Sequence, residues 1–112
     1  MASKGLMAAT TKPMILTILK GGKTYGYDII QRIKDISGGS LVWSDGMLYP
    51  VLHRLEKDGL IRSEWVMSDD SRPRKYYEIT EAGKAELVVE QEQWAQVNSL
   101  LNKIWETKTS LG

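Results

Sequence analysis

The stretch from Ser44 to Gly59, SDGMLYPVLHRLEKDG, decides the fold of this chain of 112 residues. Ser44 suits an N-cap, and Asp45 places a negative charge in the first helical turn, where it stabilises the helix dipole. Apolar residues then recur three and four positions apart, at 48, 51, 52 and 55. This spacing predicts a helix with one buried face, bent near Pro50 and ended by Asp58-Gly59.

Two further helices are predicted before this stretch. Residues 10–20 carry an apolar stripe behind Pro13, which suits a first helical turn, and two glycines end the stripe. Residues 25–37 form the second helix, with Thr24 as the expected N-cap. Its buried face is expected to hold Tyr25 or Gly26, Ile29, Ile33 and Ile36. Residues 41–43 then form either an irregular link or one short strand.

A hairpin and a long helix are predicted after this stretch. Residues 60–67 alternate in polarity and residues 75–79 are rich in β-forming side chains, with a polar, turn-forming segment between them. Thr80 suits the N-cap of a last helix, which runs without Pro or Gly from Lys84 to about Thr107. Trp43 and Trp65 are expected to fill the core between the third helix, the hairpin and the last helix.

The last helix carries an apolar seam with heptad-like spacing. A single helix with such a seam must pack on its own domain, on a partner, or on both. We therefore predict that the segment 81–107 is a dimerisation helix. The residues expected at the interface are Leu87, Trp94, Val97, Leu101 and Ile104.

Composition excludes several classes of protein. The chain has no cysteine, so disulfides and thiolate metal sites are absent, which fits a reducing compartment. No apolar run approaches the roughly 20 residues of a membrane span, and no signal peptide is visible, so we expect a cytoplasmic protein. We find no Gly-rich phosphate loop, no metal-ligand set and no nucleophile paired with a base, and expect neither a catalytic site nor a cofactor.

Charge is distributed unevenly along the chain. The net formal charge is +1, but residues 1–42 carry +4, residues 43–80 carry −1 and residues 81–106 carry −3. A basic N-terminal part and an acidic C-terminal part are often found in proteins that bind nucleic acid, although this signal is weak by itself.

The order of the predicted elements defines a fold class. Three helices followed by a hairpin form a winged helix-turn-helix, a mainly α fold of the α+β class, in which the third helix enters the major groove of DNA. We therefore predict a DNA-binding domain at residues 10–80, followed by a long C-terminal dimerisation helix.

The DNA-binding residues are expected on three segments. Tyr49 is expected opposite the leucine face, helix N-termini bind phosphate, and basic residues at the hairpin tip suit phosphate contact. The full set is Tyr25, Ser44, Gly46, Tyr49, His53, Arg54, Arg72, Arg74 and Lys75. For Tyr25, packing between the second helix and the hairpin is an equal alternative, and for Tyr27 packing is preferred. His53 is most simply an exposed helical residue.

Three motifs in this order resemble the PadR family of transcriptional regulators. They are YGYDI at 25–29, SDGMLYPVLHRLEKDGLI at 44–61 and RKYYEITEAG at 74–83, and the resemblance spans about Met14 to Leu101. One departure is Met47, where the family commonly has a small polar residue, and this puts one phosphate hydrogen bond in doubt.

The resemblance implies a homodimeric repressor. Members of the family dimerise through the C-terminal helix and bind pseudo-palindromic operators in double-stranded DNA, and many of them are released by small aromatic or drug-like compounds. The single C-terminal helix is similar to that of the small, LmrR-like subfamily. This likeness implies a ligand site at Trp94 and Asn98, whereas the simpler interpretation of Trp94 is plain dimer core.

Two other functions are compatible with the sequence. A winged helix without DNA binding can act as a protein-interaction module, and the near-neutral segment 43–80 leaves this alternative open. An enzyme is the weakest alternative, because no recognisable catalytic set is present.

Overall fold

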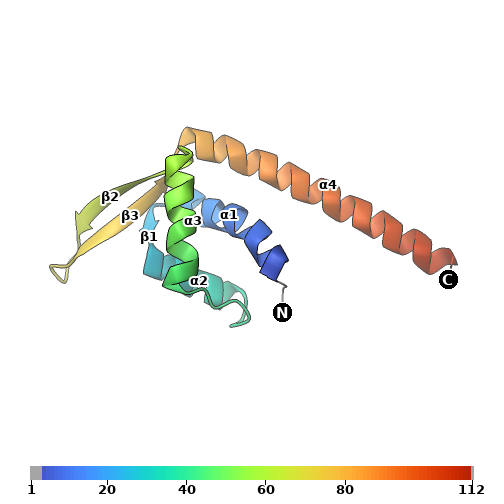
Figure 1. The fold of residues 1–112 in the computed structure, drawn as a ribbon, viewed down its shortest axis with the longest axis horizontal. Coiled ribbons are helices and arrows are strands. Elements are labelled where there is room, and N and C mark those ends of the chain that lie inside the picture. Colours follow the sequence, from blue (N-terminus) through green and yellow to red (C-terminus); the bar gives the residue numbers. More distant parts are fainter. Residues whose placement is uncertain (1–3, 112) are drawn as a thin grey trace.

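The computed structural model describes the backbone of residues 4–111 and the side chains of residues 9–106. Within this range the elements are α1 (Lys4–Lys20), β1 (Thr24–Tyr25), α2 (Gly26–Ile36), α3 (Asp45–Lys57), β2 (Ile61–Met67), β3 (Pro73–Ile79) and α4 (Glu81–Leu111). Figure 1 shows α1, α2 and α3 gathered together, with the β2–β3 hairpin projecting to one side and α4 extending to the other. We call the hairpin, residues 61–79, the wing.

The strands form a small antiparallel sheet in the order β1-β3-β2. β1 was not predicted, because the expected N-cap Thr24 instead lies in this strand and pairs with Tyr77. The Thr24 hydroxyl donates a 2.6 Å hydrogen bond to the Asp28 carboxylate, and the N-cap position of α2 falls on Tyr25, which makes no side-chain cap bond. Residues 41–43 form an irregular link rather than a strand.

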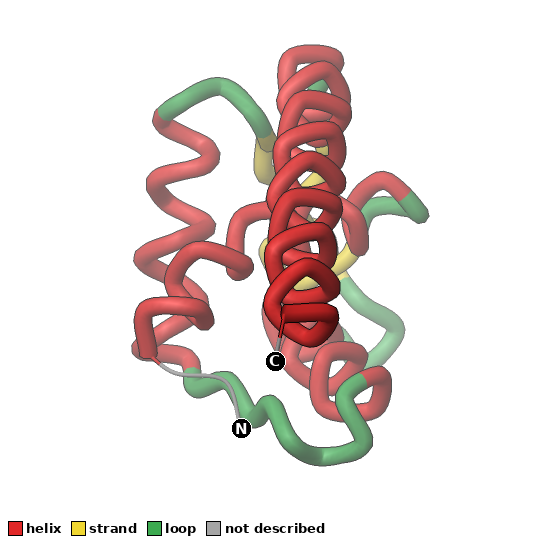
Figure 2. Tube along the Cα trace, turned by 90° about the vertical axis from the view of Figure 1, so that its right-hand side faces the viewer, coloured by secondary structure: helices red, strands yellow, loops and turns green. Residues whose placement is uncertain are grey.

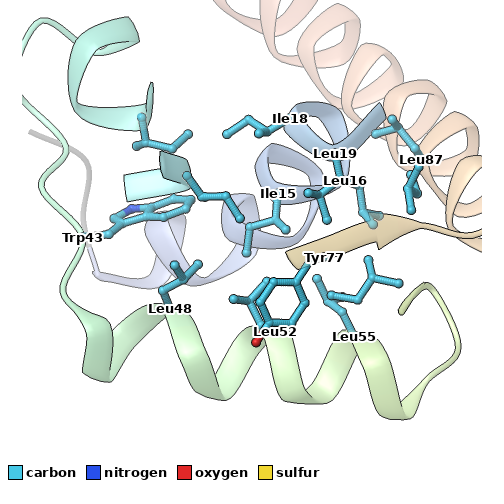
Figure 3. Packing of buried hydrophobic residues seen from close by; sticks show 14 residues of the cluster. Ile15, Leu16, Ile18, Leu19, Trp43, Leu48, Leu52, Leu55, Tyr77 and Leu87 are labelled. Carbon is cyan, nitrogen blue, oxygen red and sulfur yellow. The ribbon is translucent and has the colours of Figure 1, made fainter. Parts of the chain in front are cut away.

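One hydrophobic core joins all the main elements. Figure 3 shows α1 residues such as Ile15 and Leu16 packed against Leu48 and Leu52 of α3, with the Tyr77 ring between the helices and the sheet. Trp43 is buried in this core, as predicted. The leucine spacing on α3 therefore identified the buried face correctly, since positions 48, 52 and 55 are all enclosed.

The caps of α3 and α4 agree with the sequence. The Ser44 hydroxyl accepts a hydrogen bond from the Met47 amide at 3.2 Å, and the Thr80 hydroxyl accepts one from the Gly83 amide at 3.0 Å. Each bond satisfies a backbone amide that the helix itself leaves without an acceptor. α3 ends just before Gly59, whose φ of +77° allows the chain to reverse into β2.

Two expectations about the first helices were wrong. α1 begins at Lys4, six residues before the predicted start, so Pro13 lies inside the helix rather than in its first turn. The Thr17 hydroxyl donates a 2.7 Å hydrogen bond to the backbone carbonyl of Pro13, one turn earlier in the helix. Ile36 is exposed, because it is the last residue of α2 and points beyond the core.

Trp65 does not fill the core, contrary to the sequence-based expectation. Its side chain is 69% exposed on β2. The alternation of the strand is correct near its start, where Ile61 is buried and Ser63 half-buried, but the helices no longer cover the sheet further along β2. Strand periodicity gives the face on which a residue lies, whereas the length of the covering helix decides whether that residue is buried.

The documented contacts between α4 and the domain lie in the first turns of the helix. Lys12 of α1 lies 2.8 Å from the Glu86 carboxylate and 3.3 Å from that of Glu90, and the hydrogen bond from Lys12 to Glu86 raises the lysine pKa. Leu87 is 1% exposed and belongs to the core of its own chain, so the expectation that it faces a partner was wrong. Over the side chains that the structure describes, the rest of α4 extends away from the other helices (Figure 1), so it points toward the viewer in Figure 2, and Val97, Leu100 and Ile104 are exposed.

Candidate nucleic-acid interface

A groove runs between α3 and the wing, with the start of α2 at its base. Its volume is about 870 Å³, and we call it the α3–wing groove. Three segments that lie far apart in the sequence meet in it. It is lined by six of the nine predicted DNA-binding residues, namely Tyr25, Tyr49, His53, Arg72, Arg74 and Lys75.

The helical wall of the groove consists of Tyr49 and His53, one turn apart on α3. His53 is exposed, whereas Tyr49 is half-buried and packs against the core. The Tyr49 hydroxyl lies close to Gly26, so that a Cβ atom built on Gly26 would come within 2.5 Å of the hydroxyl oxygen. Tyr49 lines the groove, but it is half-buried rather than exposed as expected, because its ring packs against the core and against Gly26 of α2.

Tyr25 connects the base of the groove to the wing. Its ring meets the Tyr76 ring edge to face, with 5.3 Å between the centroids, and the Arg74 guanidinium lies 4.7 Å from the Tyr25 centroid. Tyr25 therefore packs on the wing, which is one of the two roles considered for it, and it also lines the groove, whereas its contact with phosphate stays a prediction. Tyr27, expected to pack, is exposed and also lines the groove.

The wing supplies the positive charge of the groove. Arg74 forms a 3.3 Å ion pair with Asp70, whose pKa is lowered by hydrogen bonds from the Ser68 hydroxyl and the Arg72 amide. Among the described side chains, Arg72 and Lys75 form no ion pair. The Lys75 ammonium lies 5.7 Å from the centroid of the Tyr77 ring, and neither cation is neutralised by a described carboxylate, so both can attract an anion entering the groove.

Cations on the opposite face of the sheet are paired with carboxylates. The Arg62 guanidinium lies 2.6 Å from the Glu78 carboxylate, which raises the Arg62 pKa and lowers that of Glu78. Lys23 lies 3.2 Å from the Glu64 carboxylate. Among the described side chains, Lys75 on β3 and Arg72 in the turn before β3 are therefore without an ion pair, whereas Arg62 and Lys23 on the other face of the sheet are neutralised by carboxylates.

Three of the predicted residues lie outside the groove. Ser44 and Gly46 are exposed at the N-terminal end of α3, and Arg54 is exposed further along the same helix. A Cβ atom on Gly46 would meet nothing nearer than the Ser44 hydroxyl at 3.9 Å, so the surface is open there. The Ser44 hydroxyl already accepts the cap hydrogen bond from Met47.

Trp65 and Pro73 also line the groove, and sequence reasoning missed both as site residues. Pro73 is the first residue of β3 and is paired with Met67 at the end of β2. Trp65 pairs with Lys75 across the hairpin. The strand register could have placed Trp65 beside a predicted site residue, but its apolar character favoured the core.

The fold and this groove define a winged helix-turn-helix protein with a long C-terminal helix. α2 and α3 form the helix-turn-helix, and the β2–β3 hairpin forms the wing beside α3 (Figure 1). In the described range, no helix has the length and apolarity needed to cross a membrane.

The chain belongs to the PadR-like family of transcriptional regulators, whose family model matches residues 15–89. It is 34% identical over 93 residues to an uncharacterised protein of Lysinibacillus sphaericus, covering 83% of this chain and 85% of that protein. It is 32% identical over 76 residues to the negative transcriptional regulator PadR of Bacillus subtilis, covering 68% of this chain and 42% of that regulator. The family consists of transcriptional regulators, not enzymes.

Solved structures agree with this assignment. The crystal structure of a PadR family transcriptional regulator from Eggerthella lenta superposes with a TM-score of 0.81 at 32% identity, covering 92% of this chain and 88% of that one. The agreement extends over the winged domain and much of α4, so the long helix belongs to the shared fold.

Proposed function

We propose that the chain is a sequence-specific repressor that binds operator DNA in the cytoplasm as a homodimer. The observation that carries this proposal is the α3–wing groove, where six predicted residues from three segments meet and where Arg72 and Lys75 form no ion pair with a described side chain. Cations gathered beside the exposed side of α3 suit the phosphates of DNA, whereas neither an enzyme nor a neutral protein-interaction module requires them.

The geometry suits a strand of duplex DNA. With α3 in the major groove and the wing beside it, one sugar–phosphate backbone passes between the two elements. Arg72 and Lys75 would then neutralise phosphates, while His53 and the start of α3 at Gly46 approach base edges and backbone. Tyr49 and Tyr25 would hold the two walls at the separation that the strand requires.

The test is binding to labelled duplex from the region upstream of the chain's own gene, measured over a range of salt. Arg72→Ala and Lys75→Ala should each weaken binding and reduce the slope of log affinity against log salt by about one. Arg62→Ala is the matched control, because Arg62 is paired with Glu78 on the other sheet face. Absence of saturable binding by the wild type at low salt would remove the proposal in favour of a protein-interaction module.

We further propose that α4 forms the dimer. The stripe that is buried against the domain at Leu87 continues beyond it at Trp94, Val97, Leu101 and Ile104. Trp94 and Leu101 are half-buried, and Val97 and Ile104 are exposed. A second copy placed on this stripe would bury it and would present two groups of α3 and wing to a pseudo-palindromic site.

Repression and ligand control complete the proposal. Repression is supported by the B. subtilis relative, whose name describes a negative regulator. Trp94 and Asn98 lie one turn apart on α4, where a small aromatic effector could stack at the dimer interface. Titration with planar aromatic compounds should quench Trp94 fluorescence, and unchanged quenching in Trp94→Phe would assign the signal to another tryptophan and reject this ligand site.

A further inference from the structure

Trp65 is a large aromatic side chain that the folded chain leaves in water. It is 69% exposed and lines the α3–wing groove, directly across the hairpin from Lys75. We propose that Trp65 forms an apolar wall of the groove and packs against a deoxyribose of the DNA strand held there. This inference rests on the proposed DNA-binding function and assigns to the groove a contact that is not electrostatic.

The position of Trp65 follows from where β2 leaves α3. The Ser63 hydroxyl donates a 2.6 Å hydrogen bond to the Glu56 carboxylate, which joins β2 to α3. Trp65 is the next residue on the same side of the strand, because side chains alternate between the two faces of a sheet. Its indole therefore lines the groove between the wing and α3 and lies outside the hydrophobic core.

The neighbouring groups suit a sugar–phosphate strand. Lys75 is paired with Trp65 across the hairpin, Arg72 lines the same groove, and His53 lies on its helical wall. Cations of this kind contact phosphates, and the deoxyribose between two phosphates presents an apolar carbon face. An indole is large and apolar with a single N–H donor, so it matches the sugar better than it matches a phosphate.

The contact has a thermodynamic signature that separates it from the cation contacts. Neutralising a phosphate releases counterions, so loss of an arginine or lysine changes the salt slope of binding. Burying an indole against a sugar releases no counterions. Loss of Trp65 should therefore weaken DNA binding by the same factor at low and high salt and leave the slope unchanged.

Met67 provides a matched control on the same strand. It is 67% exposed, two residues beyond Trp65, but it does not line the α3–wing groove. A general loss of apolar wing surface would affect both variants, whereas a contact inside the groove would affect only Trp65. Trp65→Phe retains an aromatic wall and guards against a folding defect in Trp65→Ala.

The experiment measures binding of the same labelled upstream duplex to the wild type, Trp65→Ala, Trp65→Phe and Met67→Ala at several salt concentrations. We expect Trp65→Ala to bind about tenfold more weakly with an unchanged slope, since partial burial of an aromatic side chain is worth about one power of ten in affinity. Trp65→Phe should recover most of the affinity, and Met67→Ala should match the wild type. Intrinsic fluorescence should change on binding in the wild type and much less in Trp65→Phe.

Three results would overturn the inference while leaving the proposed function intact. They are wild-type affinity in Trp65→Ala, equal losses in Trp65→Ala and Met67→Ala, or a changed salt slope in Trp65→Ala. Failure of the wild type to bind the duplex at low salt would instead reject the DNA-binding function itself, and the inference with it.

Discussion

The Tyr49 hydroxyl of α3 lies against Gly26, the first residue of α2, with no room between them for a side chain. Because Gly26 has no Cβ atom, the Tyr49 ring can close the base of the groove and set the distance between the two helices of the helix-turn-helix. The same contact explains why YGYDI at residues 25–29 and the tyrosine of the α3 stretch occur together in this sequence. The glycine is needed here for close approach, not for an unusual backbone angle.

Gly26→Ala should weaken DNA binding more than it weakens the fold. The new methyl group would displace the Tyr49 ring into the groove, while the higher helix propensity of alanine offsets a small part of the strain, because Gly26 is the first residue of α2 and not an interior one. Binding to the upstream duplex and urea unfolding would be measured on the same samples. In a Tyr49→Ala background the additional Gly26→Ala change should leave affinity unaltered, and an undiminished effect there would show that the ring is not its cause.

Gly83→Ala should destabilise the whole domain. A Cβ atom at this position would collide with the Leu60 carbonyl oxygen, which is a backbone atom and already accepts the Thr80 amide at 3.0 Å. The Leu60 carbonyl and the helix start at Gly83 cannot move apart without opening the junction between α3, the sheet and α4. The free energy of unfolding should therefore fall by about 2–3 kcal/mol. Urea unfolding of Gly46→Ala serves as the control, since Gly46 faces open space and its substitution should be neutral or stabilising.

The sequence predicted the elements of this fold well where local signals were sufficient. The caps at Ser44 and Thr80, the stop at Gly59 and the leucine face of α3 depend on neighbouring residues, and each was placed correctly. β1 was missed because its two residues become a strand only by pairing with β3, a contact that no local pattern records.

The candidate site was less predictable, because exposure depends on which element covers a residue. Charge was enough to predict Arg72 and Lys75 as site residues, because charged side chains near the tip of a hairpin stay at the surface whichever element lies beside them. Trp65 and Tyr27 were assigned to packing from their size, yet both lie beyond the cover of the helices and line the groove. Leu87 and Val97 share a stripe on α4, and only the path of the helix separates the core residue from the exposed one.

Tyr77→Phe should stabilise the protein and alter its response to alkaline pH. The Tyr77 hydroxyl is buried without a hydrogen-bond partner among the described residues, and a hydroxyl in such a position costs about 1–2 kcal/mol. Burial, together with the charges of Tyr49 and Glu56, raises the Tyr77 pKa from 10.0 to about 12. The free energy of unfolding at neutral pH should therefore rise by about 1 kcal/mol in the phenylalanine variant.

The sign of the pH effect follows from the raised pKa. Below pH 10 the hydroxyl is protonated in both the folded and the unfolded chain, so the stability contribution of its titration is constant. Between pH 10 and about 12 the unfolded chain loses this proton first, and the wild type should lose up to about 2 kcal/mol that Tyr77→Phe retains. Urea unfolding of both proteins at neutral pH and above pH 10 would measure this, and parallel pH curves would contradict it.

Val97→Glu should separate the proposed dimer without unfolding the winged domain. Val97 is 47% exposed on the stripe of α4 that continues beyond Leu87, and a carboxylate buried between two copies would lack a partner. Val88 is 49% exposed and, at 3.6 residues per turn, lies on the opposite side of the same helix, so Val88→Glu is the matched control. Sedimentation should give a monomer for Val97→Glu and a dimer for Val88→Glu and the wild type.

The monomer should bind the upstream duplex more weakly because its two DNA-contacting units are no longer linked. A dimer of Val97→Glu that matches the wild type would place the interface on another face of α4 or on another element.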